Sequence, residues 1–204
     1  MSLTDEGLIE VPGLASRWVR LADGSRAHYV TSGDSGPAVV LLHGGLPGSS
    51  GTAGWRFMAP FLGAHGFRVY CPDQPGFGLA DTRREYWPKG PHSHVEFVQQ
   101  FADALCLDQF HISGNSMGGT TATNYIVAHP ERILSYALIG TDIGDAAPLG
   151  KRPPAAIHFE EYDGTRAGMR RLMEAIIARG AAIDDDLVEM RWRSADMQRD
   201  SRAQ

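Results

Sequence analysis

The feature that most constrains this chain is a serine held between glycines where a predicted strand meets a predicted helix. Residues 114–119 read Gly-Asn-Ser-Met-Gly-Gly, after a strand expected over 109–113 and before a helical segment. A sharp strand-to-helix turn strains the backbone of Ser116, and small residues on either side let neighbouring backbone pass closely. The hydroxyl of Ser116 is then expected to lie clear of the sheet, at a helix N-terminus that favours developing negative charge. The alternative is a glycine-rich helix start that only packs tightly.

A second glycine-rich turn follows the apolar run at 38–42, which is predicted to be a strand buried on both faces. It begins His43-Gly44-Gly45-Leu46. The backbone N–H of Gly45 or Leu46 is expected to point into the same cleft as the N–H of Met117, so that two amides could stabilise an oxyanion beside Ser116. His43 precedes this turn, and we interpret it as a structural residue that supports the turn by hydrogen bonds rather than as a catalytic base.

Alternating strands and helices place these turns in an α/β fold with a mainly parallel sheet and helices on both faces. The apolar runs predict strands at residues 17–21, 27–31, 38–42, 67–71, 109–113 and 133–139. Helical spacing links Trp55, Met58, Phe61 and Leu62, and again Val95, Val98, Ala102 and Leu105. A loop over 141–154 is followed by two amphipathic helices, and no strand pattern returns.

Composition narrows the class of protein further. The chain has 204 residues with a net charge of −5, which does not favour nucleic acid or an anionic membrane as partner. No apolar run approaches the length of about 18 residues that spans a bilayer, and the first ten residues do not resemble a secretory signal. Cys71 and Cys106 have no metal-ligand spacing. We expect a cytoplasmic protein with a small-molecule substrate, no metal and no cofactor; a homo-oligomer is left open.

Three motifs stand in the order typical of α/β-hydrolases, and the chain resembles that family. They are the turn at 43–45, the loop Pro72-Asp73-Gln74-Pro75-Gly76-Phe77-Gly78, and the serine turn at 114–119. The resemblance implies that residues 1–144 form the N-terminal part of the hydrolase core and residues 145–204 part of a helical lid. The loop over 73–78 is expected to shape the rim of the cleft and to cap the next helix; a catalytic role for Asp73 is the weaker alternative.

Within that family the chain resembles the meta-cleavage-product hydrolases, which cut a carbon–carbon bond in 2-hydroxy-6-oxo-dienoates from aromatic catabolism. The likeness lies in Asn115 before the serine, Met117 after it, and segments 47–55 and 187–192. It implies that Ser116 is the nucleophile or general-base partner, that Asn115 helps bind the dienol end, and that Arg191 pairs with the carboxylate or 2-oxo group. Gly44 is also expected to contact the substrate. From the residues alone, Arg191 could equally lie along a lid seam toward an acidic side chain. Two departures, Leu46 and the pair Arg56-Phe57, leave the substrate open.

The sequence offers no convincing base or acid for Ser116. In this family the order is Ser, then Asp or Glu, then His. Asp142 and His158 are weak candidates, and His129 is expected to act only at a helix end. We therefore expect a C-terminally truncated hydrolase that lacks the last core strands, turns over little substrate and dissolves poorly. An ester or amide hydrolase of iminopeptidase type and a non-catalytic remnant are the alternatives, whereas dehalogenases and most epoxide hydrolases use an aspartate nucleophile instead.

Overall fold

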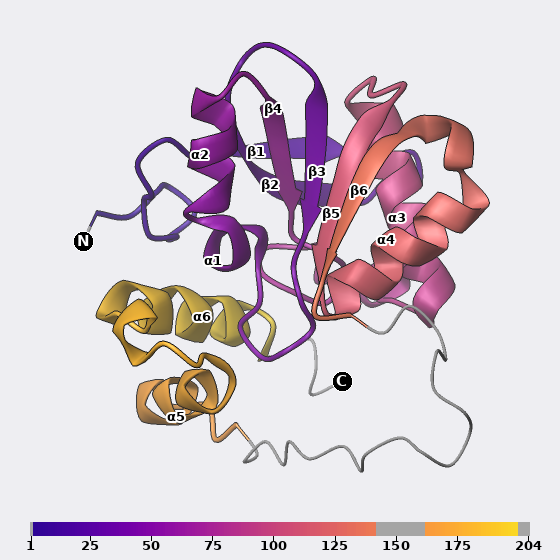
Figure 1. Ribbon diagram of the computed structural model, residues 1–204. Coiled ribbons are helices and arrows are strands. Elements are labelled where there is room, and N and C mark those ends of the chain that lie inside the picture. Colours follow the sequence, from indigo (N-terminus) through magenta and orange to yellow (C-terminus); the bar gives the residue numbers. More distant parts are fainter. Residues whose placement is uncertain (1, 142–161, 200–204) are drawn as a thin grey trace, which may run out of the picture.

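Six strands form a single, mainly parallel sheet, as the sequence predicts. The computed structural model describes residues 2–141 and 162–199 (Figure 1). The strand order is β1-β2-β4-β3-β5-β6, with β1 and β2 antiparallel to their neighbours and the others parallel. The strands are β1 Ala15–Arg20, β2 Arg26–Ser32, β3 Ala38–Leu42, β4 Arg68–Pro72, β5 Phe110–Asn115 and β6 Ile133–Ile139.

Helices cover both faces of this sheet (Figure 1). The helices are α1 Gly51–Trp55, α2 Met58–Ala64, α3 Pro91–Ala104, α4 Met117–Ala128, α5 Arg166–Ile176 and α6 Asp185–Met197, with short 3₁₀ turns at Arg84–Tyr86, Pro130–Arg132 and Gly180–Ala182. Central strand β3 is buried throughout: Val40 and Leu42 join the core beneath α3 and α4, and Val39 and Leu41 join the core beneath α1 and α2. Because successive side chains of a strand point to opposite faces, one apolar run serves both layers.

Helices α5 and α6 form a third layer with a core of its own. Met169, Met173 and Leu187 are buried there against Ile9 of the N-terminal segment and Ala53 of α1. Side chains cap both helices: Thr165 accepts from the N–H of Gly168, and Asp184 from the N–H of Leu187. The pair lies beside the loop that follows β3 (Figure 1).

The helical spacing expected over 55–62 corresponds to two short helices instead of one. Ser50 caps α1, which ends at Trp55, and α2 begins only at Met58. The predicted apolar face is wrong for two of its members, because Met58 is 45% and Phe61 is 56% exposed. Trp55 and the small Ala59 face the sheet instead. The predicted loop over 141–154 falls almost wholly outside the described residues.

Phe101 of α3 provides a test of the core. Its side chain is fully buried and contacts the ring of Tyr29 edge-on at a centroid distance of 5.3 Å. Phe101→Ala should lower the free energy of unfolding by about 3–5 kcal/mol, because it removes buried contacts and leaves a cavity. Urea unfolding measures this, with Val127→Ala on the exposed side of α4 as the control that should change little. Equal stability of the two variants would contradict the described core.

Candidate active site

Ser116 occupies a strained turn at the carboxyl end of β5, as the glycine pattern predicts. Its backbone angles are φ 52° and ψ −119°, in the left-handed region that a residue with a side chain rarely adopts. The N–H of Ser116 donates to the carbonyl of Ile139 on β6 at 2.9 Å, which fixes the turn against the next strand. The residue is exposed and lines two adjoining cavities. Its hydroxyl is thus free to meet a ligand.

The glycines around the serine let three pieces of backbone meet. A Cβ at Gly114 would lie far closer than 3.0 Å to the backbone of Gly118, and a Cβ at Gly118 would lie equally close to the carbonyls of Leu42 and His43. Real Cβ atoms do not approach so closely. The predicted close passage of backbone is therefore confirmed: the first turn of α4 rests directly on the carboxyl end of β3.

The loop after β3 faces the serine turn across the smaller cavity, which has a volume of about 280 Å³. Gly44, Gly45 and Leu46 line it together with Ser116. A Cβ at Gly45 would lie 2.9 Å from Sδ of Met117, and one at Gly44 would lie 2.9 Å from Oδ1 of Asn115. Gly45 and Met117, two of the residues expected to supply the oxyanion amides, thus lie side by side. Their role as donors stays a prediction.

His43 supports the loop instead of serving the serine. Its Nδ1–H donates to the carbonyl of Gly44 at 2.8 Å, and its Nε2 accepts from the N–H of Gln74 at 3.0 Å. The side chain of Gln74 returns a bond to the carbonyl of His43 at 2.7 Å. Burial lowers the pKa of His43 to about 4, so the ring is neutral at neutral pH. Both ring nitrogens are engaged, which confirms the predicted structural role.

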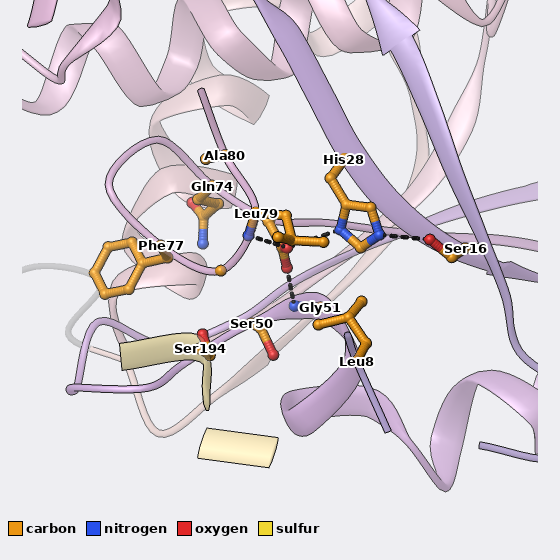
Figure 2. A network of polar contacts seen from close by, with 12 residues as sticks. Leu8, Ser16, His28, Ser50, Gly51, Gln74, Phe77, Leu79, Ala80 and Ser194 are labelled. Atoms are coloured by element: carbon orange, nitrogen blue, oxygen red, sulfur yellow. Dashed lines mark hydrogen bonds and ion pairs between the residues drawn. The ribbon is translucent and has the colours of Figure 1, made fainter. Parts of the chain in front are cut away.

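Asp73 is the centre of a buried polar network behind the site. Its carboxylate accepts from the N–H groups of Gly51 and Leu79 and from Nδ1 of His28, at 2.7–2.8 Å. Figure 2 shows these three bonds converging, with Ser16 on the far side of His28 at 2.9 Å from its Nε2. Burial alone would raise the pKa of Asp73, but His28 and the hydrogen bonds lower it overall. The network ties β1, β2, β4 and α1 together.

No pattern in the sequence predicted the pairing of His28 with Asp73. His28 lies inside a strand predicted only from its apolar neighbours, and 45 residues separate it from Asp73. The one available signal was a histidine within a buried strand, since a buried imidazole needs a polar partner. Both Asp73 oxygens are occupied by the scaffold, and the buried Asp73 lines neither cavity beside Ser116, so this residue holds the loop from behind instead of forming the rim of the cleft.

Asn115 and Arg191 reach the same two cavities as Ser116. Asn115 donates from Nδ2 to the carbonyl of Ile139 at 3.2 Å. Arg191 extends from α6 and donates from Nη2 to the carbonyl of Pro47 at 2.9 Å and to Oγ of Ser49 at 3.2 Å. The structure therefore brings together Asn115 of β5 and Arg191 of α6, which lie 76 positions apart in the chain.

The charge of Arg191 is buried, and no counterion lies beside it among the described residues. The residue is only 8% exposed, its Nε has no hydrogen-bond partner, and no described carboxylate forms an ion pair with it. Burial lowers the pKa of Arg191 to about 10, so the guanidinium is still charged at neutral pH. The interpretation in which Arg191 runs to an acidic side chain finds no such partner among the described residues. The pocket instead presents an unpaired cation.

A larger cavity of about 630 Å³ extends from Ser116 toward α5. It shares Trp55, Ile176 and Arg191 with the smaller one and continues along α1, α2 and the α5–α6 pair. Over the described parts of the chain, no group of three or more His, Cys, Asp or Glu residues could hold a metal ion. No described helix is long and apolar enough to cross a membrane.

Comparison with known proteins identifies the family. The alpha/beta hydrolase fold model matches residues 37–185. The chain belongs to the alpha/beta hydrolase family. It is 32% identical over 171 residues to a 2-hydroxy-6-oxo-6-phenylhexa-2,4-dienoate hydrolase of Comamonas testosteroni, covering 82% of this chain and 59% of the relative. It is 31% identical over 185 residues to a 2-hydroxy-6-oxononadienedioate/2-hydroxy-6-oxononatrienedioate hydrolase of Pseudomonas putida, covering 86% and 64%.

Solved structures agree with the sequence relatives. A serine hydrolase involved in carbazole degradation superimposes with a TM-score of 0.74 at 31% identity, over 93% of this chain and 67% of the other. The family resemblance expected from the motifs at 43–45, 72–78 and 114–119 is thus confirmed. This hydrolase chain spans about three fifths of the length of the curated relatives it matches.

The acid and base expected for Ser116 are not visible in the described parts of this hydrolase. Asp142 and His158, the two weak candidates, fall outside the described residues. His129 closes α4, where its N–H donates to the carbonyl of Tyr125 and its ring lies 3.9 Å from Glu131. Within the described ranges, Ser116 Oγ has no hydrogen bond to an imidazole.

Gly118→Ala tests the backbone contact beneath the serine. The added methyl would collide with the carbonyls of Leu42 and His43, so helix α4 must move off β3. We expect a loss of about 2 kcal/mol or more in the free energy of unfolding, measured with urea. Gly180→Ala is the control, because nothing lies within 4 Å of its Cβ position. A stable Gly118→Ala chain would contradict the described contact.

The neutral, buried His43 predicts a pH dependence of stability. The unfolded chain binds a proton on this ring below the ordinary pKa of 6.5, whereas the folded chain does not until about 4. Stability should therefore be complete above pH 6.5 and fall toward pH 4, by up to about 1.4 kcal/mol per pH unit from this group. Urea unfolding across that range should give a flatter profile for His43→Asn than for the parent. The exposed His65→Asn should keep the parent profile; identical profiles for all three would refute the assignment.

Proposed function

We propose that this protein is a serine-dependent hydrolase of a carbon–carbon bond in 2-hydroxy-6-oxo-dienoates, the ring-cleavage products of aromatic compounds. The observation that carries the proposal is one cavity that joins the exposed, strained Ser116 to the buried cation of Arg191, which has no counterion among the described residues. The relatives named for such substrates support it. An ordinary ester hydrolase needs the serine but has no use for the buried cation.

Arg191 would bind the carboxylate or 2-oxo end of the substrate. Burial of its charge has a large desolvation cost, and an incoming anion offsets it. A guanidinium presents parallel N–H groups that match a carboxylate, and Nε of Arg191 is among the donors still unused. Asn115, on the same cavity wall, would bind the dienol end and assist its ketonisation.

Ser116 would act on the ketone at the other end of the dienoate, or on its hydrate. The N–H of Met117 and that of Gly45 or Leu46 would stabilise the oxyanion that forms there, with Gly44 in contact with the dienol end. Helices α5 and α6 form part of a lid over a core that comprises residues 1–144, and they supply Arg191 and Ile176 to the cavity. This division assigns chemistry to the core and recognition to the lid.

Binding of a dienoate to a Ser116→Ala chain tests the proposal without requiring turnover. We expect 2-hydroxy-6-oxo-6-phenylhexa-2,4-dienoate to bind saturably, followed by its own absorbance, and Arg191→Gln to weaken binding about tenfold or more. Arg193→Gln is the matched control, since Arg193 lies on the same helix but pairs with Glu189 at 2.8 Å.

The same experiment separates the competing function. Aryl esters and prolyl amides carry no carboxylate for Arg191, so they should bind the parent and Arg191→Gln equally. If the dienoate fails to bind while Ser116 in the parent turns over such esters or amides, the protein is an ester or amide hydrolase. Dienoate binding that ignores Arg191 would remove the argument from the buried cation.

A further inference from the structure

The larger cavity beside Ser116 ends in a region that is apolar except for one arginine. Apolar side chains form its wall beyond the serine, namely Ala53, Phe57, Met58, Met173, Ile177 and Leu187. Among the described residues that line this cavity, Arg56 and Arg191 are the two that carry charge. Since Arg191 serves the carboxylate end in the proposed function, Arg56 decides whether the other end of the substrate meets a usable positive charge.

Both terminal nitrogens of the Arg56 guanidinium are already engaged. It donates from Nη1 and Nη2 to the two oxygens of Asp184, each at 2.9 Å, and from Nη2 to the carbonyl of Ala182 at 3.5 Å. Its Cζ also lies over the ring of Phe57, 4.4 Å from the ring centre. Arg56 is only 8% exposed. This geometry is the bidentate pairing that a substrate carboxylate would need for itself.

A second interaction, the N-cap of α6, also holds the carboxylate of Asp184 in place. One of its oxygens accepts from the N–H of Leu187 at 2.7 Å and so caps α6. The hydrogen bond from Arg56 lowers the pKa of Asp184, which keeps the carboxylate ionised at neutral pH. A second carboxylate entering this end of the cavity would therefore meet an arginine whose charge is already neutralised by Asp184, which lies outside the cavity lining. An uncharged apolar group meets a wall that suits it.

From the Arg56–Asp184 pair we infer that the cavity takes dienoates with an apolar, uncharged group at carbon 6, and that Asp184 determines this specificity by occupying Arg56. The inference rests on the proposed function and refines it. The curated relatives include hydrolases named for both kinds of substrate, one with a phenyl group and one with a second carboxylate. The pair favours the phenyl-bearing substrate, because Asp184 leaves Arg56 without free charge for a second carboxylate while the apolar wall accommodates a phenyl group.

Competitive binding to the Ser116→Ala chain tests the inference. We expect 2-hydroxy-6-oxo-6-phenylhexa-2,4-dienoate to bind about tenfold or more tightly than 2-hydroxy-6-oxononadienedioate. Asp184→Asn should narrow this ratio about tenfold, because it frees Arg56 for the second carboxylate. Asparagine is as good an N-cap as aspartate, so α6 should keep its start. Adding Arg56→Met to Asp184→Asn should abolish the gain.

Asp185→Asn is the matched control, because it removes the same charge one residue along α6 from an exposed pair with Arg170. It should leave the ratio unchanged. If neither dienoate binds, the proposed function fails and the inference fails with it. If both bind and the dienedioate binds equally well or better, the inference alone is overturned. An unchanged ratio in Asp184→Asn removes Asp184 from the determination of specificity.

Discussion

The contact between the first turn of α4 and the carboxyl end of β3 is the constraint on which the site depends. Gly118 lets the helix rest on the carbonyls of Leu42 and His43 without a side chain between them. That contact fixes where the turn before the helix must run, and it imposes the positive φ of Ser116. Such strain persists only where the surrounding structure holds it, and here the bond from the Ser116 N–H to Ile139 and the packing of α4 on β3 do so. The exposed position of the Ser116 side chain thus depends on the packing of Gly118 against β3.

Buried polar side chains differ in whether the surrounding protein supplies them with partners. His43, Asp73 and Arg56 each have partners for the groups that point inward, and they hold loops and helices together. Arg191 has hydrogen bonds but no counterion in the part of the chain that the structure describes. Because an uncompensated buried charge destabilises a fold, its retention next to Ser116 marks the place where an outside anion completes the electrostatics. The contrast distinguishes scaffold from site without reference to any relative.

Local sequence patterns predicted the strands and the serine turn well, but they did not predict contacts between residues far apart in the chain. Strands β3 and β6 end where their apolar runs end, and the turn at Ser116 follows from glycines within a few positions. The Arg56–Asp184 pair joins residues 128 positions apart, and no spacing rule connects them. The same holds for His28 and Asp73. The division of the segment near Trp55 into α1 and α2 was missed because helical spacing does not show a break between two turns.

Helix α6 and the segment after the Gly44–Leu46 loop are fastened to each other by backbone as well as by side chains. Gly48 lies against the main chain of Arg191, Ser194 donates to the carbonyl of Ser49, and Arg191 donates to the carbonyl of Pro47. These three contacts, at residues 47–49, hold α6 and the loop segment together. A tilt of α6 would therefore displace residues 47–49, which follow directly on the loop whose amides are predicted to face Ser116.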